Sequence, residues 1–405
     1  MNRVKLGEVA DTCLGKMLDA KKNKGTLHPY LANVNVRWGS FDLDGLQEMP
    51  FEDGEAERYG LKSGDLVMCE GGEPGRCALW TDASTDMRFQ KALHRIRAHK
   101  DVLDIRYLYY WFLYAGKRSM LDRYFTQTTI KHLVGEDLRT VELDLPDLER
   151  QKEIADVLSL IDAKIEANNK TIAELDSLAR TVYDYWFMCR VAPSDWEPVK
   201  VADLVEVDRG ISYTANELAD EGQPMLNLAS FNTDGTIKLS GTKYLTHVAK
   251  DSKLLASGDL LMCTTQQTPV DPAGTTDVVA RTFLVPNTFE VAPTFSMDVV
   301  RLKERRDGAR FLVNQMMRRN DYHRYTSGYA SGTKIKHLDV EGALSFSAML
   351  PPDGDPLIRR YADLSLVWHK EQSTLLNEST KLVALRDWLL PMLMNGQVTI
   401  DSEAR

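Results

Sequence analysis

The chain contains one tetrapeptide twice. Ile-Lys-His-Leu occurs at Ile130–Leu133 and again at Ile335–Leu338. Each copy follows a threonine-containing segment and is followed at the same distance by a Leu-Pro pair. A separation of about two hundred residues is much longer than the roughly 20–50 residues of a solenoid repeat. The sequence therefore predicts two copies of one domain with its connector.

Other segments align when the two copies are superimposed on this tetrapeptide. "SGDLVMC" at Ser63–Cys69 is nearly identical to "SGDLLMC" at Ser257–Cys263, and "VKLGEV" at Val4–Val9 resembles "VKVADL" at Val199–Leu204. The spacing between matches drifts, as expected when loops differ in length while the framework persists. The matched single residues are Gly15 with Gly210, Phe89 with Phe295, Arg95 with Arg301, and Arg123-Tyr124 with Arg324-Tyr325.

The first copy ends in a long helical pattern. From Glu149 to Phe187 there is no Gly or Pro, and apolar residues follow a seven-residue repeat over five heptads, which indicates a coiled coil. Asp147 is the predicted N-cap. Asn168 lies on the seam, where it either sets the register or is locally solvated. The seam consists of Ile154, Leu158, Ile161, Ile165, Asn168, Ile172, Leu175, Ala179, Val182 and Trp186.

The second copy ends in a similar pattern. Asp355 as N-cap and Pro356 at the first helical position predict where this helix begins. Its seam is less regular than the first. The seam positions are Tyr361, Trp368, Leu375, Leu382 and Leu389, with Leu364, Leu385 and Met392 alongside.

Two narrow apolar stripes in one chain are best buried against each other. If like halves are related by a two-fold axis, the two helices run antiparallel, and the globular copies lie at opposite ends of a rod on the order of 58 Å long. The predicted fold is α/β (α+β), with two homologous domains, two long helices packed as an antiparallel coiled coil, and pseudo-two-fold symmetry. The predicted domains are 1–148, a central helix at 149–190, 191–355, a distal helix at 356–395 and a tail at 396–405.

The globular copies show mixed local patterns. "DLVMC" and "ALW" are typical of strands, and "EGGEPG" of a turn. One helical stretch is expected in each copy, at Ile105–Tyr124 and Ala309–Tyr325.

Composition narrows the class of protein. Of 405 residues, 43% are hydrophobic and 27% charged, as in ordinary soluble globular proteins. The five cysteines form no C-x-x-C pair, which argues against a disulfide framework or zinc site. The N-terminus has no secretory-leader pattern, and the longest apolar run is far shorter than the roughly 20 residues of a spanning helix. We expect a cytoplasmic protein with no membrane anchor.

Motifs for catalysis are absent from the sequence. It has no G-x-x-x-x-G-K-[ST] phosphate loop, no Asn/Asp-Pro-Pro-Tyr methyltransferase tetrapeptide and no H-E-x-x-H metal motif. We therefore expect no catalytic residue and no metal site in this chain.

Basic residues interleaved with aromatic ones favour nucleic-acid contact. In the second copy a surface that begins at Arg301 is suited to nucleic acid. Phosphate contact is favoured for the cluster Arg318–Lys336, where basic residues outnumber acidic ones although the whole chain has a formal net charge of −9. For the aromatic residues of the first copy, such as Tyr107 and Trp111, a place in the helix core is the favoured alternative. The net charge argues against a free-standing DNA binder and for partners that supply part of the phosphate contacts.

These features resemble a known family. The segment Asp144–Phe187 is similar to the central conserved region of type I restriction–modification specificity subunits, and the "SGDL…GR" and "TIKHL…LP" segments resemble frame motifs of their target-recognition domains. The resemblance covers essentially the whole chain. It implies a DNA reader without catalysis of its own, in which each target-recognition domain reads one half-site of double-stranded DNA and the two helices act as a ruler for the spacer.

The resemblance also implies partners. Two methyltransferase (modification) subunits would bind S-adenosylmethionine and methylate adenine, and two restriction subunits would use ATP and Mg for translocation and cleavage. This chain itself would bind no cofactor. In the second copy Gly274-Thr275 replaces Gly75-Arg76, so an arginine contact is not expected there. The predicted DNA-binding residues are Glu73, Arg76, Arg118, Arg123, Thr129, Lys131, Thr265, Gln266, Gln267, Arg318, Arg319, Arg324, Thr333, Lys334 and Lys336.

Three hypotheses remain open from the sequence. The favoured one is a sequence-reading adaptor for DNA. The second is a non-catalytic scaffold whose coil recruits partners and whose end domains bind proteins. The third is an enzyme with an unrecognised site. For the repeated tetrapeptide, we expect Ile and Leu to pack in the framework and Lys and His to lie near the DNA backbone.

Overall fold

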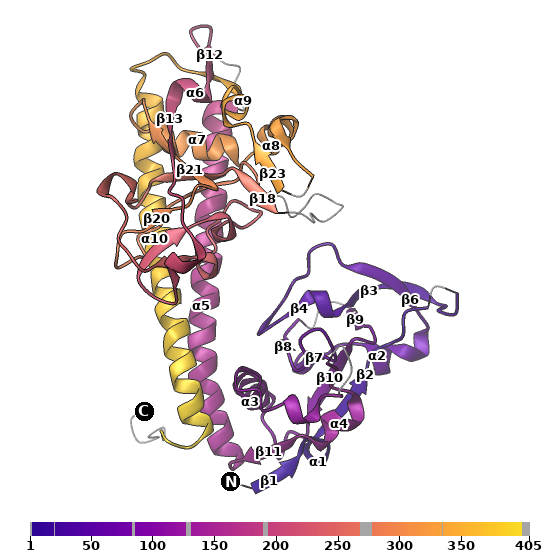
Figure 1. Cartoon of the computed structure of the whole chain (residues 1–405). Helices are drawn as coiled ribbons and strands as arrows, with labels where there is room; N and C mark the ends of the chain where they lie inside the picture. The colour runs from indigo at the N-terminus through magenta and orange to yellow at the C-terminus, as the bar shows by residue number, and fades with distance from the viewer. Residues whose placement is uncertain are drawn as a thin grey trace. The chain divides into compact units, whose positions relative to one another are not determined.

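The structure is a computed structural model of the whole chain. The chain divides into two compact units. Unit 1 comprises Met1–Lys164 and Leu382–Arg405, and unit 2 comprises Ile165–Lys381. Helices α5 (Leu148–Tyr183) and α10 (Pro356–Met394) contribute to both units (Figure 1). The structure describes residues 2–19, 21–82, 86–126, 131–188, 193–267, 278–333 and 335–398.

Unit 1 is a mixed α/β unit. Its short helices are α1 (Leu6–Val9), α2 (Ala56–Tyr59), α3 (Ile105–Lys117) and α4 (Gly135–Thr140). Its strands are β1 (Asn2–Lys5), β2 (Ala10–Leu14), β3 (Thr26–Leu31), β4 (Val36–Arg37), β5 (Ser40–Phe41), β6 (Gln47–Phe51), β7 (Asp65–Cys69), β8 (Cys77–Trp80), β9 (Arg88–Phe89), β10 (Leu93–Ala98) and β11 (Glu142–Leu145). "DLVMC" and "ALW" are strands, as predicted.

The main sheet of unit 1 has the strand order β2-β10-β7-β8, and all its pairs are antiparallel. Helix α3 packs on this sheet, and its aromatic residues are buried, with Tyr107 1% and Trp111 6% exposed. The favoured interpretation of these aromatic residues as core is therefore confirmed. Unit 1 also has a second sheet, β6-β3-β9, and the two-stranded pairs β1-β11 and β4-β5.

Unit 2 is built in the same way. Its short helices are α6 (Val201–Leu204), α7 (Ala309–Met317), α8 (Asn320–Thr326) and α9 (Val340–Leu344). Its strands are β12 (Glu197–Lys200), β13 (Val205–Arg209), β14 (Leu218–Ala219), β15 (Gln223–Leu226), β16 (Lys243–Leu245), β17 (Leu260–Cys263), β18 (Thr265–Gln267), β19 (Thr282–Leu284), β20 (Thr294–Phe295), β21 (Val299–Glu304), β22 (Ala330–Ser331), β23 (Ile335–Leu338) and β24 (Ser347–Leu350).

The predicted duplication is visible in the topology. The order β13-β21-β17-β19 in unit 2 repeats β2-β10-β7-β8 in unit 1, and β12-β24 repeats β1-β11. The aligned glycines also match. A Cβ added to Gly15 would lie 2.2 Å from the Gln90 carbonyl oxygen, and one added to Gly210 would lie 2.1 Å from the carbonyl oxygen of Ser296. Both positions require a residue without a side chain, because the backbones approach too closely for a Cβ.

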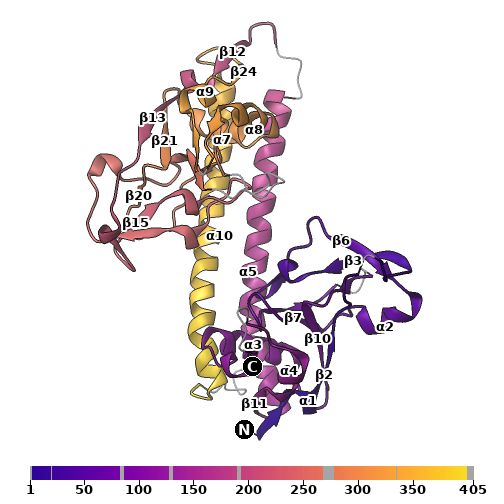
Figure 2. The same cartoon turned by 45° about the vertical axis from the view of Figure 1, so that its right-hand side comes forward.

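The long helices pair antiparallel inside each unit. In unit 1 Arg386 of α10 donates to Asp162 of α5 at 2.7 Å. In unit 2 the Tyr361 hydroxyl of α10 donates to the Ala179 carbonyl of α5 at 3.1 Å, so α5 ends where α10 begins. The unit 2 parts of the two helices run side by side in both views, and in Figure 2 strands β13, β15, β20 and β21 lie on the α10 side. The antiparallel arrangement predicted from the two seams is confirmed.

The helix starts agree with the predicted caps. The Asp147 carboxylate accepts from the Arg150 amide at 2.9 Å, and the Asp355 carboxylate accepts from the Leu357 amide at 2.7 Å. A five-residue π-helix, Asp184–Met188, extends α5. Asn168 is 2% exposed and donates to Glu378 and Ser379, so it is a buried polar seam residue rather than a solvated one.

Three details differ from the sequence predictions. The helix expected at Ile105–Tyr124 ends at Lys117, followed by Ser119 with φ +54°, and the one expected at Ala309–Tyr325 is divided into α7 and α8. Leu364 and Leu385, placed beside the α10 seam, are 40% and 43% exposed. Among the described residues, no helix combines the length and apolar character that a membrane span requires.

Candidate nucleic-acid interface

In both units the repeated tetrapeptide pairs with the chain that follows the Ser-Gly-Asp-Leu segment, and in unit 2 it forms strand β23. In unit 2 β23 pairs antiparallel with β18, with Thr265 opposite His337 and Gln266 opposite Lys336. The Leu338 amide donates to the Thr264 carbonyl at 2.9 Å. The structure thus brings together two sets of predicted DNA-binding residues that are about seventy positions apart in the chain.

Unit 1 has the same backbone arrangement. The Leu133 amide donates to the Glu70 carbonyl at 2.8 Å, and Gly71 forms an antiparallel bridge with His132. A Cβ on Gly71 would lie 2.7 Å from the His132 ring, so a larger residue at this position would have to displace that ring. Lys131 is therefore next to the loop that carries Glu73 and Arg76.

The prediction that Ile and Leu of the tetrapeptide pack in the framework is only partly right. Leu133 and Leu338 are buried in their units, as expected. Ile335 is 43% exposed, so the prediction that it packs in the framework is wrong. The side chains of a strand alternate between its two faces, which places Ile335 on the same face as the exposed His337. Ile130 lies outside the described residues.

A hydrogen-bonded network holds the loop of unit 1. Arg76 donates to the Glu73 carboxylate at 2.9 Å and to the Asn33 carbonyl at 3.0 Å. Glu73 also accepts from the Trp38 indole at 2.7 Å. The Arg76 side chain is mostly buried and the Glu73 carboxylate is exposed, so Glu73 offers an accessible acceptor on a fixed loop.

The other predicted residues of unit 1 lie on its surface. Lys131 is 3.3 Å from the Asp122 carboxylate. Arg123 donates to Tyr124 at 2.7 Å and pairs with Glu142 at 3.4 Å, and the Arg118 guanidinium lies over the ring of Tyr114. Thr129 lies outside the described residues.

Two predicted residues of unit 2 stabilise the loop through hydrogen bonds of their side chains. Thr265 donates to the Asp298 carboxylate at 3.2 Å, and the Gln266 side-chain carbonyl accepts from the Val278 amide at 2.7 Å. Both side chains are buried. Their contact with DNA stays a prediction, as does that of Gln267, whose backbone lies in β18. Thr333 is exposed, Lys336 half-buried, and Lys334 lies outside the described residues.

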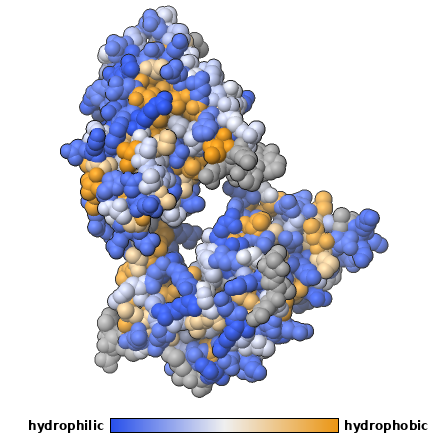
Figure 3. Space-filling view, viewed as in Figure 1, coloured by the Kyte–Doolittle hydropathy of each residue, from blue (hydrophilic) through white to orange (hydrophobic). Residues whose placement is uncertain are grey.

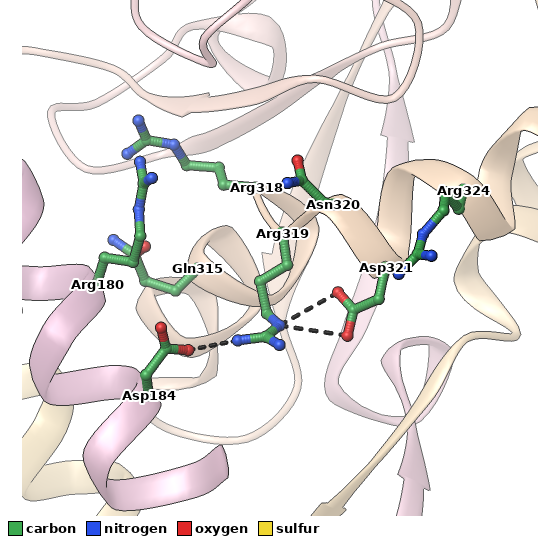
Figure 4. A pocket seen from close by; sticks show the side chains of 8 residues that line it. All are labelled: Arg180, Asp184, Gln315, Arg318, Arg319, Asn320, Asp321 and Arg324. Carbon is green, nitrogen blue, oxygen red and sulfur yellow. Dashed lines mark hydrogen bonds and ion pairs between the residues drawn. The ribbon is translucent and has the colours of Figure 1, made fainter. Parts of the chain in front are cut away.

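The remaining predicted arginines of unit 2 line one cavity of about 320 Å³ (Figure 4). Arg318 is ion-paired with Asp176 of α5. Arg319 is ion-paired with Asp184, the first residue of the π-helix that extends α5, and with Asp321 of α8. Arg324 of α8 is exposed, and no ion pair to it occurs among the described residues. The full lining is Arg180, Asp184, Gln315, Arg318, Arg319, Asn320, Asp321 and Arg324.

Sequence reasoning missed Arg180, which completes this arginine cluster from α5. Arg180 lies off the heptad seam, on the face that a helical wheel assigns to solvent. It pairs with Asp176 one turn earlier at 3.4 Å. The signal that could have found it is the run Asp176, Arg180, Asp184 at four-residue spacing, since such residues lie on one face of a helix.

The position of His94 differs between the two units. The Nε2 atom of His94 lies 3.0 Å from the Leu133 carbonyl oxygen, in contact with the tetrapeptide strand. Burial lowers its pKa, because the charged imidazolium is poorly solvated there. The aligned position in unit 2 is the apolar Val300.

Comparisons with known proteins agree with this arrangement. Residues 1–177 match the family model described as "Type I restriction modification DNA specificity domain". The chain is 22% identical over 322 residues to the type I restriction enzyme MjaIX specificity subunit of Methanocaldococcus jannaschii, covering 75% of this chain and 71% of that protein. It is 26% identical over 147 residues to the MjaVIII specificity subunit of the same organism, covering 33% of this chain and 34% of that protein.

A solved structure has the same fold across both units. The crystal structure of the type I restriction–modification system S subunit from M. genitalium superimposes with a TM-score of 0.58 at 14% identity, covering 97% of this chain and 95% of that one. The visible surface of each unit is mostly hydrophilic with scattered apolar residues (Figure 3). The fold is that of this solved S subunit. Residues 1–177 match the type I specificity-domain model, and the chain as a whole is similar to type I restriction–modification specificity subunits.

Proposed function

We propose that this chain reads a two-part sequence in double-stranded DNA, one half-site with each recognition domain. The domains are residues 1–148 and 191–355, and the helices at 149–190 and 356–395 set the number of unread base pairs between the half-sites. The tail, 396–405, has no role in this proposal. The observation that carries it is the duplication. Both units pair the backbone after the Ser-Gly-Asp-Leu segment with the repeated tetrapeptide in the same register.

The chemistry of this loop and strand suits a groove of DNA. Carboxylate side chains accept from the exocyclic amine of cytosine, and basic side chains contact phosphates. In unit 1 an exposed Glu73 and an exposed Lys131 flank the paired backbone. A hydrogen-bonded loop fixes such groups before DNA arrives, which reduces the entropy lost on binding.

Exposed apolar residues on α10 support docking of partner subunits on the coil. Leu364 and Val367 are exposed in unit 2, and Leu385 and Trp388 in unit 1. The two pairs are separated by three heptads, so they recur at equivalent positions of a coiled-coil helix. We propose that two adenine methyltransferase subunits, which bind S-adenosylmethionine, pack here. Two restriction subunits that use ATP and Mg join that core.

The experiment is selection from random double-stranded DNA by the chain assembled with its methyltransferase partner. The proposal requires a motif of two fixed parts separated by a constant number of unselected base pairs. Selection of a single uninterrupted motif contradicts the two-domain reading. Selection of nothing, with the partner still bound, favours a scaffold that binds only proteins.

A further inference from the structure

Unit 2 has a pocket lined by four arginines. Arg180 of α5 and Arg318, Arg319 and Arg324 from the α7–α8 region surround the cavity of about 320 Å³. A cavity of this size is at the lower end of the roughly 300–1,000 Å³ of ligand sites. It accommodates a small anionic group better than a large organic ligand.

The charges at this pocket do not cancel. Asp176, Asp184 and Asp321 pair with three of the guanidinium groups, those of Arg180, Arg318 and Arg319. Asp176 itself is shared between Arg180 and Arg318. Four guanidinium groups against three carboxylates leave one positive charge, and Arg324 is the lining arginine without an ion pair in the described ranges. A single phosphodiester carries one negative charge, so it matches this excess.

Unit 1 gives a direct comparison. Aligning the Arg-Tyr pairs places Lys117, Arg118 and Arg123 at the positions of Arg318, Arg319 and Arg324. Lys117 is ion-paired with Asp387 of α10 at 2.6 Å, and Arg123 pairs with Glu142. The basic groups of this site in unit 1 are therefore largely satisfied within the protein.

Arg180 of α5 is the main difference between the arginine pocket of unit 2 and the corresponding site of unit 1. The seam alignment of the two helices places Asp387 of α10 at the position of Arg180 of α5. A negative charge in unit 1 is thus replaced by a positive charge in unit 2. Arginine also presents its N–H donors in a planar fork that fits phosphate oxygens.

We propose that the pocket of Arg180, Arg319 and Arg324 binds one backbone phosphate of the DNA, outside the bases read by the β18–β23 loop. This inference rests on the proposed function, because the phosphate belongs to the DNA that the chain reads. Arg318 holds the pocket wall by pairing with Asp176 and donating to the Asp234 carbonyl at 3.2 Å. Contact with a phosphate adds affinity on every sequence and makes unit 2 bind more tightly to the backbone than unit 1.

The test uses the chain assembled with its methyltransferase partner and DNA that carries the selected motif. Arg324→Ala removes an exposed, unpaired guanidinium, so the unit folds normally. We expect it to weaken binding equally on motif and non-motif DNA and to lower the slope of log affinity against log salt by about one. Arg180→Asp, which gives unit 2 the charge found in unit 1, is expected to lower the slope at least as much. Arg209→Ala removes the same charge from an exposed position on β13 and should leave the slope unchanged.

A neutral backbone linkage locates the phosphate. DNA duplexes with one methylphosphonate at successive positions should reveal one linkage at which neutralisation weakens the wild-type complex as much as Arg324→Ala does. That same linkage should have no effect in the Arg324→Ala complex, since coupled losses are not additive. If every linkage has the same effect in both proteins, the pocket does not hold a DNA phosphate.

Two further outcomes are decisive. In the first, inorganic phosphate stabilises the wild-type chain against heat but does not stabilise Arg324→Ala, while the two proteins have identical salt slopes for DNA binding. This result would assign the pocket to a free phosphate and overturn the proposal. The wild-type complex must first select a two-part motif. Loss of that selection refutes the proposed function, whereas a retained motif without coupling at Arg324 refutes only this inference.

Discussion

Arg95 and Arg301 hold equivalent places in the two units, and neither is a surface residue. Each guanidinium donates to backbone carbonyls of a neighbouring loop. Each also lies over an aligned aromatic ring, at 5.7 Å from the centroid of Phe89 and 5.6 Å from that of Phe295. The interpretation of Arg301 as part of a basic DNA-facing surface is therefore wrong. Its charge is used to join loops inside unit 2.

His94 makes the stability of unit 1 depend on pH. Its folded-state pKa is lowered from 6.5, so the unfolded chain binds a proton at a higher pH than the folded one does. Stability is therefore fully present above about pH 6.5 and falls as the pH drops below that value. We expect His94→Val, which introduces the residue found in unit 2, to flatten the dependence of the unfolding free energy between pH 7 and 5.

Urea titrations at several pH values measure this dependence. His369 in unit 2 is also buried with a lowered pKa, so part of the slope remains in the variant. His99→Ala, at an exposed histidine of unit 1 that lies 3.4 Å from Asp11, serves as the comparison for loss of a surface histidine. A variant profile identical to that of the wild type would show that His94 does not contribute.

Lys336 lies opposite Gln266 in the paired strands of unit 2. If it contacts a phosphate, Lys336→Ala weakens binding to all sequences about equally and lowers the salt slope by about one. Binding titrations on motif and mismatched DNA measure both effects, with Lys200→Ala, at an exposed position on β12, as the control. A loss confined to one base position would show instead that Lys336 reads a base.

At the scale of elements, the helix seams were predictable because heptad periodicity is a local property. All ten seam positions of α5 are buried or half-buried. The misplacement of Leu364 and Leu385 has a physical reason. In unit 2 the buried face of α10 is unusually polar, with Ser365, His369 and Ser373, and an apolar pattern cannot reveal a polar buried face.

The arginine pocket was harder to predict for a different reason. Its ion pairs join α5 to residues more than a hundred positions later in the chain, such as Asp176 with Arg318. The basic composition of the segment was visible in the sequence. Which guanidinium groups are already paired was not, because that depends on tertiary packing. The duplicated loop and strand could be aligned from the sequence. Their direct pairing could not be predicted from it.

Asn168 is the buried polar residue of the coil, and its replacement tests what it contributes. A polar residue at a seam position fixes the register at a cost in stability. We expect Asn168→Leu to raise the free energy of unfolding by about 1 kcal/mol and to broaden the range of accepted DNA spacers. Denaturant midpoints and selection of the spacer measure the two effects.

Ala167→Leu, at an exposed position one residue earlier, is the control for added apolar volume. A denaturant midpoint lower for Asn168→Leu than for the wild type would mean that the hydrogen bonds from Asn168 to Glu378 and Ser379 have a net stabilising effect on the coil.

At the scale of the whole molecule, the ruler proposal concerns both helices together. Removing Ile165–Thr171 from α5 and the facing Leu376–Leu382 from α10 keeps the heptad phase and shortens both helices by about 10 Å. We expect the selected spacer to change by about three base pairs, with both half-site sequences unaltered. Selection from random DNA with the partner subunit measures this.

Removing the heptad from α5 alone is the control, since it shifts one seam against the other and should abolish selective binding. If the double deletion alters the letters of a half-site and leaves the spacer unchanged, the helices do not act as a ruler.

The pairing of β1 with β11, and of β12 with β24, has a consequence for how such a chain can diversify. The polypeptide enters and leaves each globular copy at neighbouring positions, because the opening strand lies beside the closing one. Everything between those two strands can grow, shrink or be exchanged for another sequence without displacing the junction to the long helix. Each copy is therefore a replaceable cassette, and new combinations of cassettes need no redesign of the connectors.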